Sequence, residues 1–263
     1  MKTLAQNTIA GLHRLARQRG LPSRVAIYFH ELESHQRAPF RDAMVALRAL
    51  GYRDVGPDDY VAGRGGDKLL FVSFDDNFKS WHQSRQLLDE TGVRATFYVN
   101  SLPFRDRCSD AELAAFFERI RFGGERVTMT TVELRELARD GHTIGCHSHS
   151  HHLLSALPRE AWDSEIRQSK VVLEEIIGQP VEHFAYPYGM RRCFSPALYD
   201  YCLEIGFRSV AAAIPAMLHA GPERRPMIQR SGWRFDQSVE RNLLDLEVDG
   251  QLFERVTGRS AIG

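Results

Sequence analysis

The sequence predicts an α/β domain built on a parallel sheet, and two observations support this fold class. Short apolar runs rich in β-branched and aromatic residues alternate with longer stretches of helical period, which is the pattern of successive βα units. The chain has 263 residues, close to the roughly 250 residues of a single barrel of such units. No repeat or long Pro/Gly/Ser-rich linker divides the sequence, so we expect a single domain over residues 1–263.

The pattern defines the expected elements and their limits. Glycines that follow apolar periodic runs mark helix ends, because glycine readily adopts the left-handed conformation found there. An N-terminal helix is expected over residues 1–20, a barrel over about 21–235, and a C-terminal helix over about 236–258. The expected strands are 25–29, 69–74, 95–99, 143–146, 183–186, 209–213 and 227–229, and the expected helices of the barrel are 40–50, 80–91, 110–120, 131–139, 159–177 and 196–205.

Composition and charge argue against several classes of protein. Hydrophobic residues make up 43% and charged residues 26% of the chain, as in ordinary globular domains. Lys plus Arg number 34, as do Asp plus Glu, so the net positive charge typical of nucleic-acid binders is missing and no nucleic-acid partner is expected. The four cysteines form no CxxC pair, and a chain of this length needs no disulfides, so reduced thiols are expected.

The N-terminal segment predicts a basic surface helix. Its apolar positions are interrupted by basic residues, so we expect neither a signal peptide nor a transmembrane segment, and we expect a cytoplasmic protein. We interpret the segment as a helix packed on the barrel with a solvated basic face, and contact with an anionic membrane surface is the alternative. The basic residues that precede the first acidic residue are Lys2, Arg14, Arg17, Arg19 and Arg24.

Two adjacent carboxylates end one of the apolar strands. The run Phe71-Val72-Ser73-Phe74 leads directly into Asp75 and Asp76. In parallel α/β folds the carboxyl ends of strands are where active sites collect, and paired carboxylates can divide metal binding from proton transfer. The alternative is that one aspartate caps the helix beginning near Ser80.

A histidine-rich segment follows another predicted strand. His147, His149, His151 and His152 fall within six residues, which core packing does not explain. Neutral imidazoles are common zinc ligands, and a catalytic zinc site typically has three protein ligands and a water. Two histidines and one carboxylate would satisfy that number, whereas a solvated His-rich loop is the alternative.

An aromatic turn follows a third strand. Tyr186, Pro187, Tyr188 and Gly189 come directly after the predicted strand at 183–186, where proline stops the strand and glycine permits a tight turn. Aromatic side chains at such a rim can line a sugar pocket, but they serve equally often in barrel packing.

Together and in this order, the F-D-D strand end, the H-S-x-x-H segment and the Y-P-Y-G turn resemble the motifs of the polysaccharide deacetylase superfamily. This superfamily is also called carbohydrate esterase family four and is defined by a NodB-type homology domain. The segments Gly92 to Val99 (GVRATFYV) and Ile27 to His30 (IYFH) are similar to further strands of the family. The resemblance extends from about Val25 to Arg230 and implies a distorted (β/α) barrel with about seven parallel strands.

The resemblance implies a metal centre and a base. By position, Asp76, His147 and His151 match the metal-binding triad of the family, and Asp75 matches its catalytic base. Zinc is the expected divalent metal, with cobalt, nickel and manganese as alternatives. His149 and His152 are expected in supporting positions of the loop.

The same resemblance implies the substrate contacts. Tyr188 matches the residue whose backbone N–H stabilises the oxyanion, which gives it a catalytic role. Tyr186, Pro187 and Tyr188 are expected to contact the substrate.

The chain departs from the family pattern at three points. The late motif that supplies an acidic histidine has no copy after Gly206, so His30 is expected to protonate the departing amine, with His219 as the alternative. Ala185 stands where many members have an arginine, which leaves the orientation of Asp75 unexplained. Asn77 replaces a usual glycine, and asparagine tolerates the left-handed backbone that such a turn requires.

These features imply a metal-dependent hydrolase that removes an N-acyl group, in the simplest case N-acetyl, from an amino sugar. The expected substrate is a nucleotide- or lipid-linked precursor in surface polysaccharide biosynthesis. One alternative is a deformylase or a ring C–N hydrolase on the same fold, and another is a non-catalytic sugar-binding barrel. The intact Asp75 favours catalysis, because a pure binding site needs no base beside its metal.

Overall fold

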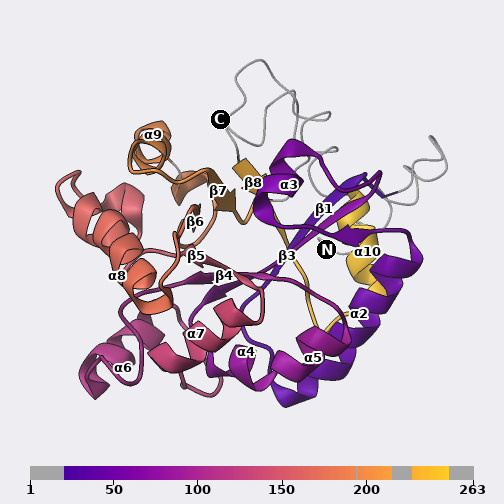
Figure 1. Cartoon of the computed structure of the whole chain (residues 1–263), viewed down its shortest axis with the longest axis horizontal. Helices are drawn as coiled ribbons and strands as arrows, with labels where there is room; N and C mark the ends of the chain where they lie inside the picture. The colour runs from indigo at the N-terminus through magenta and orange to yellow at the C-terminus, as the bar shows by residue number, and fades with distance from the viewer. Residues whose placement is uncertain (1–20, 194, 215–226, 249–263) are drawn as a thin grey trace, which may run out of the picture.

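The centre of the fold is a parallel sheet that curves into a nearly closed barrel (Figure 1). The computed structural model describes residues 21–193, 195–214 and 227–248. The expected helix at 1–20 and the alternative acid His219 lie outside these residues. In the described residues the strands are β1 (Arg24–Phe29), β2 (Arg53–Asp54), β3 (Leu69–Asp76), β4 (Thr96–Val99), β5 (Thr143–Cys146), β6 (His183–Ala185), β7 (Ser209–Ala212), β8 (Met227–Gln229) and β9 (Ser231–Gly232).

One interrupted strand joins the two edges of the sheet. The strand order is β8-β7-β6-β5-β4-β3-β1-β9, with β2 paired to β3, and every pairing is parallel. Because a single residue, Arg230, separates β8 from β9, the same short segment pairs with β7 on one side and with β1 on the other. Counted this way, the main circuit has the seven strands that were expected. The predicted distorted (β/α) barrel is confirmed.

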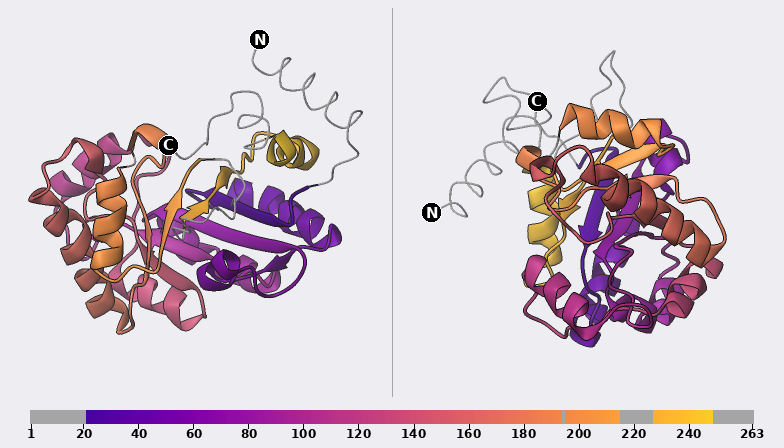
Figure 2. Two further views of the ribbon diagram at one scale, coloured as in Figure 1. Left: turned by 90° about the horizontal axis from the view of Figure 1, so that it is seen from above. Right: turned by 90° about the vertical axis from the view of Figure 1, so that its left-hand side faces the viewer.

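Helices cover the outside of the barrel (Figures 1 and 2). The six expected helices are present, although the one at 80–91 is broken at Ser84 and the one at 159–177 begins with a π-helical turn, η3 (Asp163–Arg167). Of the expected C-terminal helix, the described residues contain α10, which contacts α2. The helices are α2 (Arg37–Ala49), α3 (Pro57–Ala62), α4 (Lys79–Gln83), α5 (Arg85–Glu90), α6 (Asp110–Arg119), α7 (Thr131–Arg139), α8 (Gln168–Ile177), α9 (Pro196–Glu204) and α10 (Val239–Val248), and the short 3₁₀ turns are η1 (Ser34–Gln36), η2 (Leu154–Ala156) and η4 (Arg191–Cys193).

The alternation of side chains along β3 divides the core in two. Phe74 packs on the rings of Phe29 and Phe97, with centroids 5.2 and 5.1 Å away, in the large cluster between strands and helices. Phe71 belongs to a second, smaller cluster. Successive residues of a strand point to opposite faces, so Ser73 and Asp75 share the face of Phe71, which is the barrel interior. The strand therefore delivers a carboxylate into the interior of the barrel.

The cysteines and the helices bear on two expectations from the sequence, namely reduced thiols and the lack of a transmembrane segment. All four cysteines are free, as expected. In the described part of the chain, no helix has the length and apolar character needed to cross a membrane. The domain limits and the cytoplasmic location stay predictions.

Candidate active site

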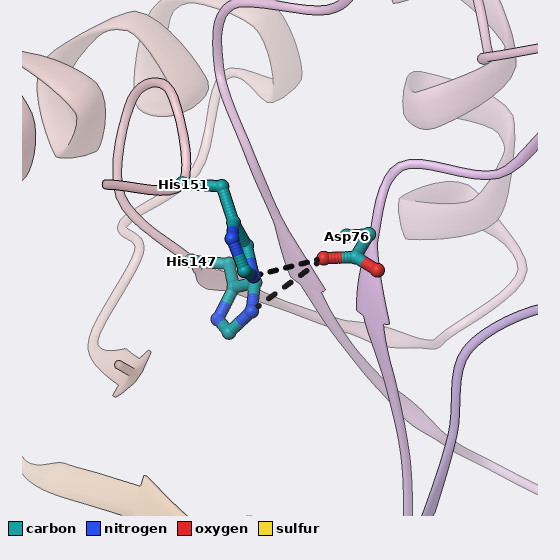
Figure 3. A group of neighbouring side chains, drawn as sticks. All are labelled: Asp76, His147 and His151. Carbon is teal, nitrogen blue, oxygen red and sulfur yellow. Dashed lines mark ion pairs between the residues drawn. The ribbon is translucent and has the colours of Figure 1, made fainter. Parts of the chain in front are cut away.

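Three ligand-type side chains meet at the carboxyl ends of the strands (Figure 3). Asp76 is the last residue of β3, His147 follows β5, and His151 lies in the loop beyond it. Asp76 Oδ1 is 3.7 Å from His147 Nε2 and 3.3 Å from His151 Nε2. Since all three side chains are buried and their donor atoms lie within 4.8 Å of one another, they could hold one metal ion.

The surroundings of these residues fit a divalent cation. The Nδ1–H of His147 donates to the carbonyl oxygen of Ala185 at 2.7 Å, which leaves its Nε2 lone pair directed at Asp76. Asp76 Oδ1 is buried and accepts no hydrogen bond from any residue that the structure describes, an arrangement that is costly for a carboxylate oxygen unless a cation satisfies it. Two imidazoles and one carboxylate are the donor set of many catalytic zinc sites.

Burial governs the protonation of these groups. It lowers the pKa of His151 well below its usual value, and the neighbouring His147 and His30 lower it further, so the ring is in the neutral form that binds metal. Burial also raises the pKa of Asp76, although His30 and His147 oppose the effect. The site thus disfavours a charge on His151 and would be stabilised by a positive ion beside Asp76.

The backbone is strained at this site. Of the five non-glycine residues with positive φ in the described chain, four lie here, namely Asp76 (89°), Ser148 (68°), His151 (62°) and Tyr188 (64°). Such conformations are uncommon for residues with a Cβ and persist where the surrounding structure holds them, often at functional sites. The strain turns Asp76 out of the regular alternation of β3 and towards the histidines.

The expectation that Asn77 takes up the left-handed turn is wrong, because the positive φ falls on Asp76 instead. Asn77 has a different use. Its Oδ1 accepts from the backbone N–H of Met129 at 3.2 Å, and its Nδ2 donates to the carbonyl oxygen of Asn100 at 3.4 Å. The amide therefore joins the loops on either side of the strand end.

Arg230 orients Asp75, and the sequence analysis missed it. Its Nη1 and Nη2 donate to the two carboxylate oxygens of Asp75 at 2.6 and 2.8 Å. Nη1 also donates to Ser73 Oγ at 3.0 Å, and the guanidinium lies between the rings of Tyr28 and Tyr98, 5.0 Å from each centroid. The arginine missing at Ala185 is thus replaced from another strand. The sequence offered one signal for Arg230, which is its position as a charged residue directly after the predicted strand at 227–229.

This pairing keeps Asp75 ionised. Burial alone would raise the pKa of Asp75, but the charge and hydrogen bonds of Arg230, with help from His147 and His30, lower the pKa below its usual value. Arg230 is fully buried and its own pKa is raised. Each carboxylate oxygen keeps a second lone pair, so Asp75 can still accept a proton or a hydrogen bond from the substrate side.

The remaining predicted residues occupy different environments. His30 follows β1, is exposed, and lies close enough for its charge to affect both Asp75 and Asp76. Tyr188 is half-buried, and its ring lies edge-on to His151 at 4.8 Å. Tyr186 directly follows β6, but its side chain is packed in the core, and Pro187 is buried as well.

The chain is similar to a known protein family and to several solved structures. The family model for polysaccharide deacetylase matches residues 62–210. Among solved structures, IcaB from Ammonifex degensii is 21% identical with a TM-score of 0.66, over 84% of this chain and 97% of its own. Streptococcus pyogenes deacetylase PplD, solved with acetate, is 15% identical with a TM-score of 0.66, over 84% and 96%. A de-N-acetylase from Aggregatibacter actinomycetemcomitans is 14% identical with a TM-score of 0.60, over 84% and 99%.

A search of curated protein sequences gives no match. At these identities the solved structures establish the fold.

Removal of Arg230 should destabilise the barrel strongly. We predict that Arg230→Gln lowers the free energy of unfolding by about 3–5 kcal/mol, because it leaves the buried Asp75 without its counter-ion. Urea denaturation at neutral pH measures the loss. Arg234→Gln is the matched control, since Arg234 also pairs with an aspartate, Asp236, but in an exposed position, and it should change little. Equal stabilities for the two variants would contradict a structural role for the buried pair.

Proposed function

Because the chain belongs to the polysaccharide deacetylase family, whose members hydrolyse carbon–nitrogen bonds other than peptide bonds, we propose that it removes an N-acetyl group from an amino sugar in a metal-dependent reaction. The observation that carries the proposal is the division of labour between two adjacent aspartates. Asp76 faces His147 and His151, whereas Asp75 is held by Arg230. A site that merely bound a sugar would have no need for the second carboxylate.

Asp76, His147 and His151 would hold the metal, and zinc is the proposed ion. A divalent cation at this position would polarise the carbonyl group of the substrate and lower the pKa of a water molecule. The protein contributes the rigidity of the ligands. His147 is fixed by its hydrogen bond to Ala185, and the strained backbone of Asp76 fixes the carboxylate.

Asp75 would act as the general base. It lies next to Asp76 in the chain, is ionised because Arg230 stabilises its charge, and retains unused lone pairs. It can therefore take the proton of an attacking water without being a ligand itself. The bidentate pairing also fixes the direction of the carboxylate, which matters because proton transfer requires hydrogen-bond distance and alignment.

Tyr188 would stabilise the negative charge that develops on the carbonyl oxygen. Its positive φ and the following turn at Gly189 orient the peptide, and within the described residues its backbone N–H makes no hydrogen bond. An unpaired N–H beside the proposed ligand His151 is suited to this role. The Tyr188 hydroxyl donates to the carbonyl oxygen of Arg119 at 3.4 Å and so holds the turn in place. Of the three predicted contacts in this turn, Tyr188 is the most accessible and is the proposed substrate contact, whereas Tyr186 and Pro187 are buried, which suits a supporting role better than direct contact.

His30 would protonate the departing amine. It is exposed at the end of β1, on the same rim as the end of β3, since Phe29 pairs with Phe74. It borders a cavity of about 490 Å³ that also contacts Tyr28, Glu31 and Trp233. Its charge acts on both Asp75 and Asp76, so it lies near the proposed base and the proposed ligand.

The proposed substrate is an N-acetylated sugar attached to a nucleotide or a lipid. The similar proteins whose names include deacetylase or de-N-acetylase support the acetyl group. The size of the cavity at His30 and the mixture of aromatic and polar groups around it suit a sugar ring. Incubation of zinc-loaded protein with a panel of N-acetylated nucleotide sugars and short N-acetylated oligosaccharides, with acetate release as the readout, tests the proposal.

Asp75→Asn should abolish most acetate release. We predict a loss of about 10²- to 10⁴-fold in kcat, because the amide cannot accept the proton while it retains the size of the carboxylate. Asp89→Asn, which changes an exposed aspartate that also pairs with an arginine, Arg94, and lies outside this cavity, is the control and should be as active as wild type. No acetate from any substrate with wild-type protein, or full activity of Asp75→Asn, would contradict the proposed function.

The pH dependence should identify His30 as the acid. We predict that His30→Ala removes the alkaline limb of the pH–rate profile, and that it slows amide hydrolysis about 10²- to 10⁴-fold while sparing an activated ester, whose leaving group needs no proton. His82→Ala, at a histidine of α4 that pairs with Glu136 and does not line this cavity, should leave the profile unchanged. An unaltered alkaline limb in His30→Ala, or equal losses on both substrates, would refute this role.

A further inference from the structure

The loop between the two histidine ligands is held from outside by one buried carboxylate. Glu165 accepts hydrogen bonds from Ser150 Oγ at 2.6 Å and from the Ser150 backbone N–H at 3.1 Å. Its backbone carbonyl oxygen accepts a third bond, from the N–H of His149, at 2.7 Å. His149 and Ser150 both lie between His147 and His151, so Glu165 bonds to two consecutive residues of the loop.

The carboxylate of Glu165 has no cationic partner. Only 8% of the residue is exposed, and it forms no ion pair within the described residues. Burial of an ionised carboxylate is costly unless its oxygens are satisfied, and here the two bonds from Ser150 satisfy them. An apolar side chain would pack at this position without that cost. The presence of a glutamate therefore indicates that its hydrogen bonds to the loop have a role.

The local helix geometry directs Glu165 to the loop. Glu165 lies in the π-helical turn η3 (Asp163–Arg167), which continues directly into α8. A π turn is rare and inserts an extra residue into a helix, and it is frequently associated with functional sites. Here the side chain and the carbonyl oxygen of the same residue both bond to the loop.

The loop needs such support because its backbone is strained. Ser148 and His151 have positive φ values of 68° and 62°, and this conformation costs energy for residues with a Cβ. Inside the loop, Ser148 Oγ accepts from the His151 N–H at 3.1 Å. On its other side the loop is bonded by Arg119, which donates to the Ser150 carbonyl oxygen. Ser150 is therefore fixed at its N–H, its hydroxyl and its carbonyl oxygen.

We infer that Glu165 is a positioning residue for the metal centre, which keeps the loop in the strained conformation that brings His151 to Asp76 and His147. This inference rests on the proposed function, since it assumes that these three residues bind a metal. Glu165 does not approach the substrate. Its effect passes through Ser150 to the next residue, His151.

Zinc affinity tests the inference directly. We expect Glu165→Ala to weaken zinc binding about 10- to 100-fold, the usual effect of losing a residue that supports metal ligands. Glu165→Gln should bind nearly as tightly as wild type, because its amide can accept from the Ser150 N–H and donate to the Ser150 hydroxyl. Glu175→Ala is the matched control, at an exposed glutamate of α8 in the same helix. Competition with a fluorescent chelator gives the affinities, and unchanged affinity in folded Glu165→Ala would overturn the inference.

Ser150→Ala cuts the same contact from the loop side and covers the case in which Glu165→Ala fails to fold. It should weaken zinc binding by less than Glu165→Ala, because one of the two bonds to the carboxylate remains. In the double variant the two effects should not add, since they remove one interaction. Wild-type affinity in Ser150→Ala, or additive effects, would contradict the inference.

Hydrogen exchange separates this inference from the proposed function. In metal-free protein, the backbone N–H groups of His149 and Ser150 should exchange faster in Glu165→Ala than in Glu165→Gln or Glu175→Ala. Wild-type protein that binds no zinc would refute the metal site, whatever the exchange rates. Unchanged exchange at these two N–H groups would refute the role of Glu165, even if the metal site is correct.

Discussion

The buried pair of Asp75 and Arg230 is the interaction on which the rest of the site depends. Alternation along β3 sends Asp75 into the barrel, where a lone carboxylate would lose its hydration and take up a proton. Arg230 prevents this, and it does so from the single residue that separates β8 from β9. Arg230 thus neutralises the charge of Asp75. It also stands where the chain passes from β8, which pairs with β7, to β9, which pairs with β1. The point at which the barrel closes and the partner that keeps Asp75 ionised are therefore the same residue.

The site combines this rigid interior with a strained rim. Asp76 leaves the alternation of its strand through a positive φ and turns to His147 and His151, while the loop that carries His151 is itself held in left-handed conformations. Neighbouring elements supply the bonds that maintain the strain, including those from Glu165 and Asn100. Two adjacent aspartates can therefore face different partners, although they are consecutive in the sequence.

Much of this architecture could be predicted from the sequence, because it depends on local patterns. The seven strands of the main circuit follow from short apolar runs, and the meeting of Asp76 with His147 follows from the common edge shared by parallel strand ends. Arg230 could not be predicted in this way, since it lies 155 positions from Asp75 and meets it because the barrel closes. Glu165 was equally hidden, because a helical run in the sequence does not show where a π turn lies or which distant loop a side chain of that turn contacts. The prediction for Asn77 was wrong because residue propensity does not show which residue at the end of a strand adopts the positive φ.

Metal binding by variants of the two aspartates tests the account most directly. Elemental analysis of dialysed, zinc-loaded protein should give about one zinc ion per chain for wild type and for Asp75→Asn, and a loss of bound zinc for Asp76→Ala. This result would show that adjacent carboxylates have separate partners, as the geometry indicates. Zinc retained by Asp76→Ala at wild-type affinity, or zinc lost from folded Asp75→Asn, would contradict the account.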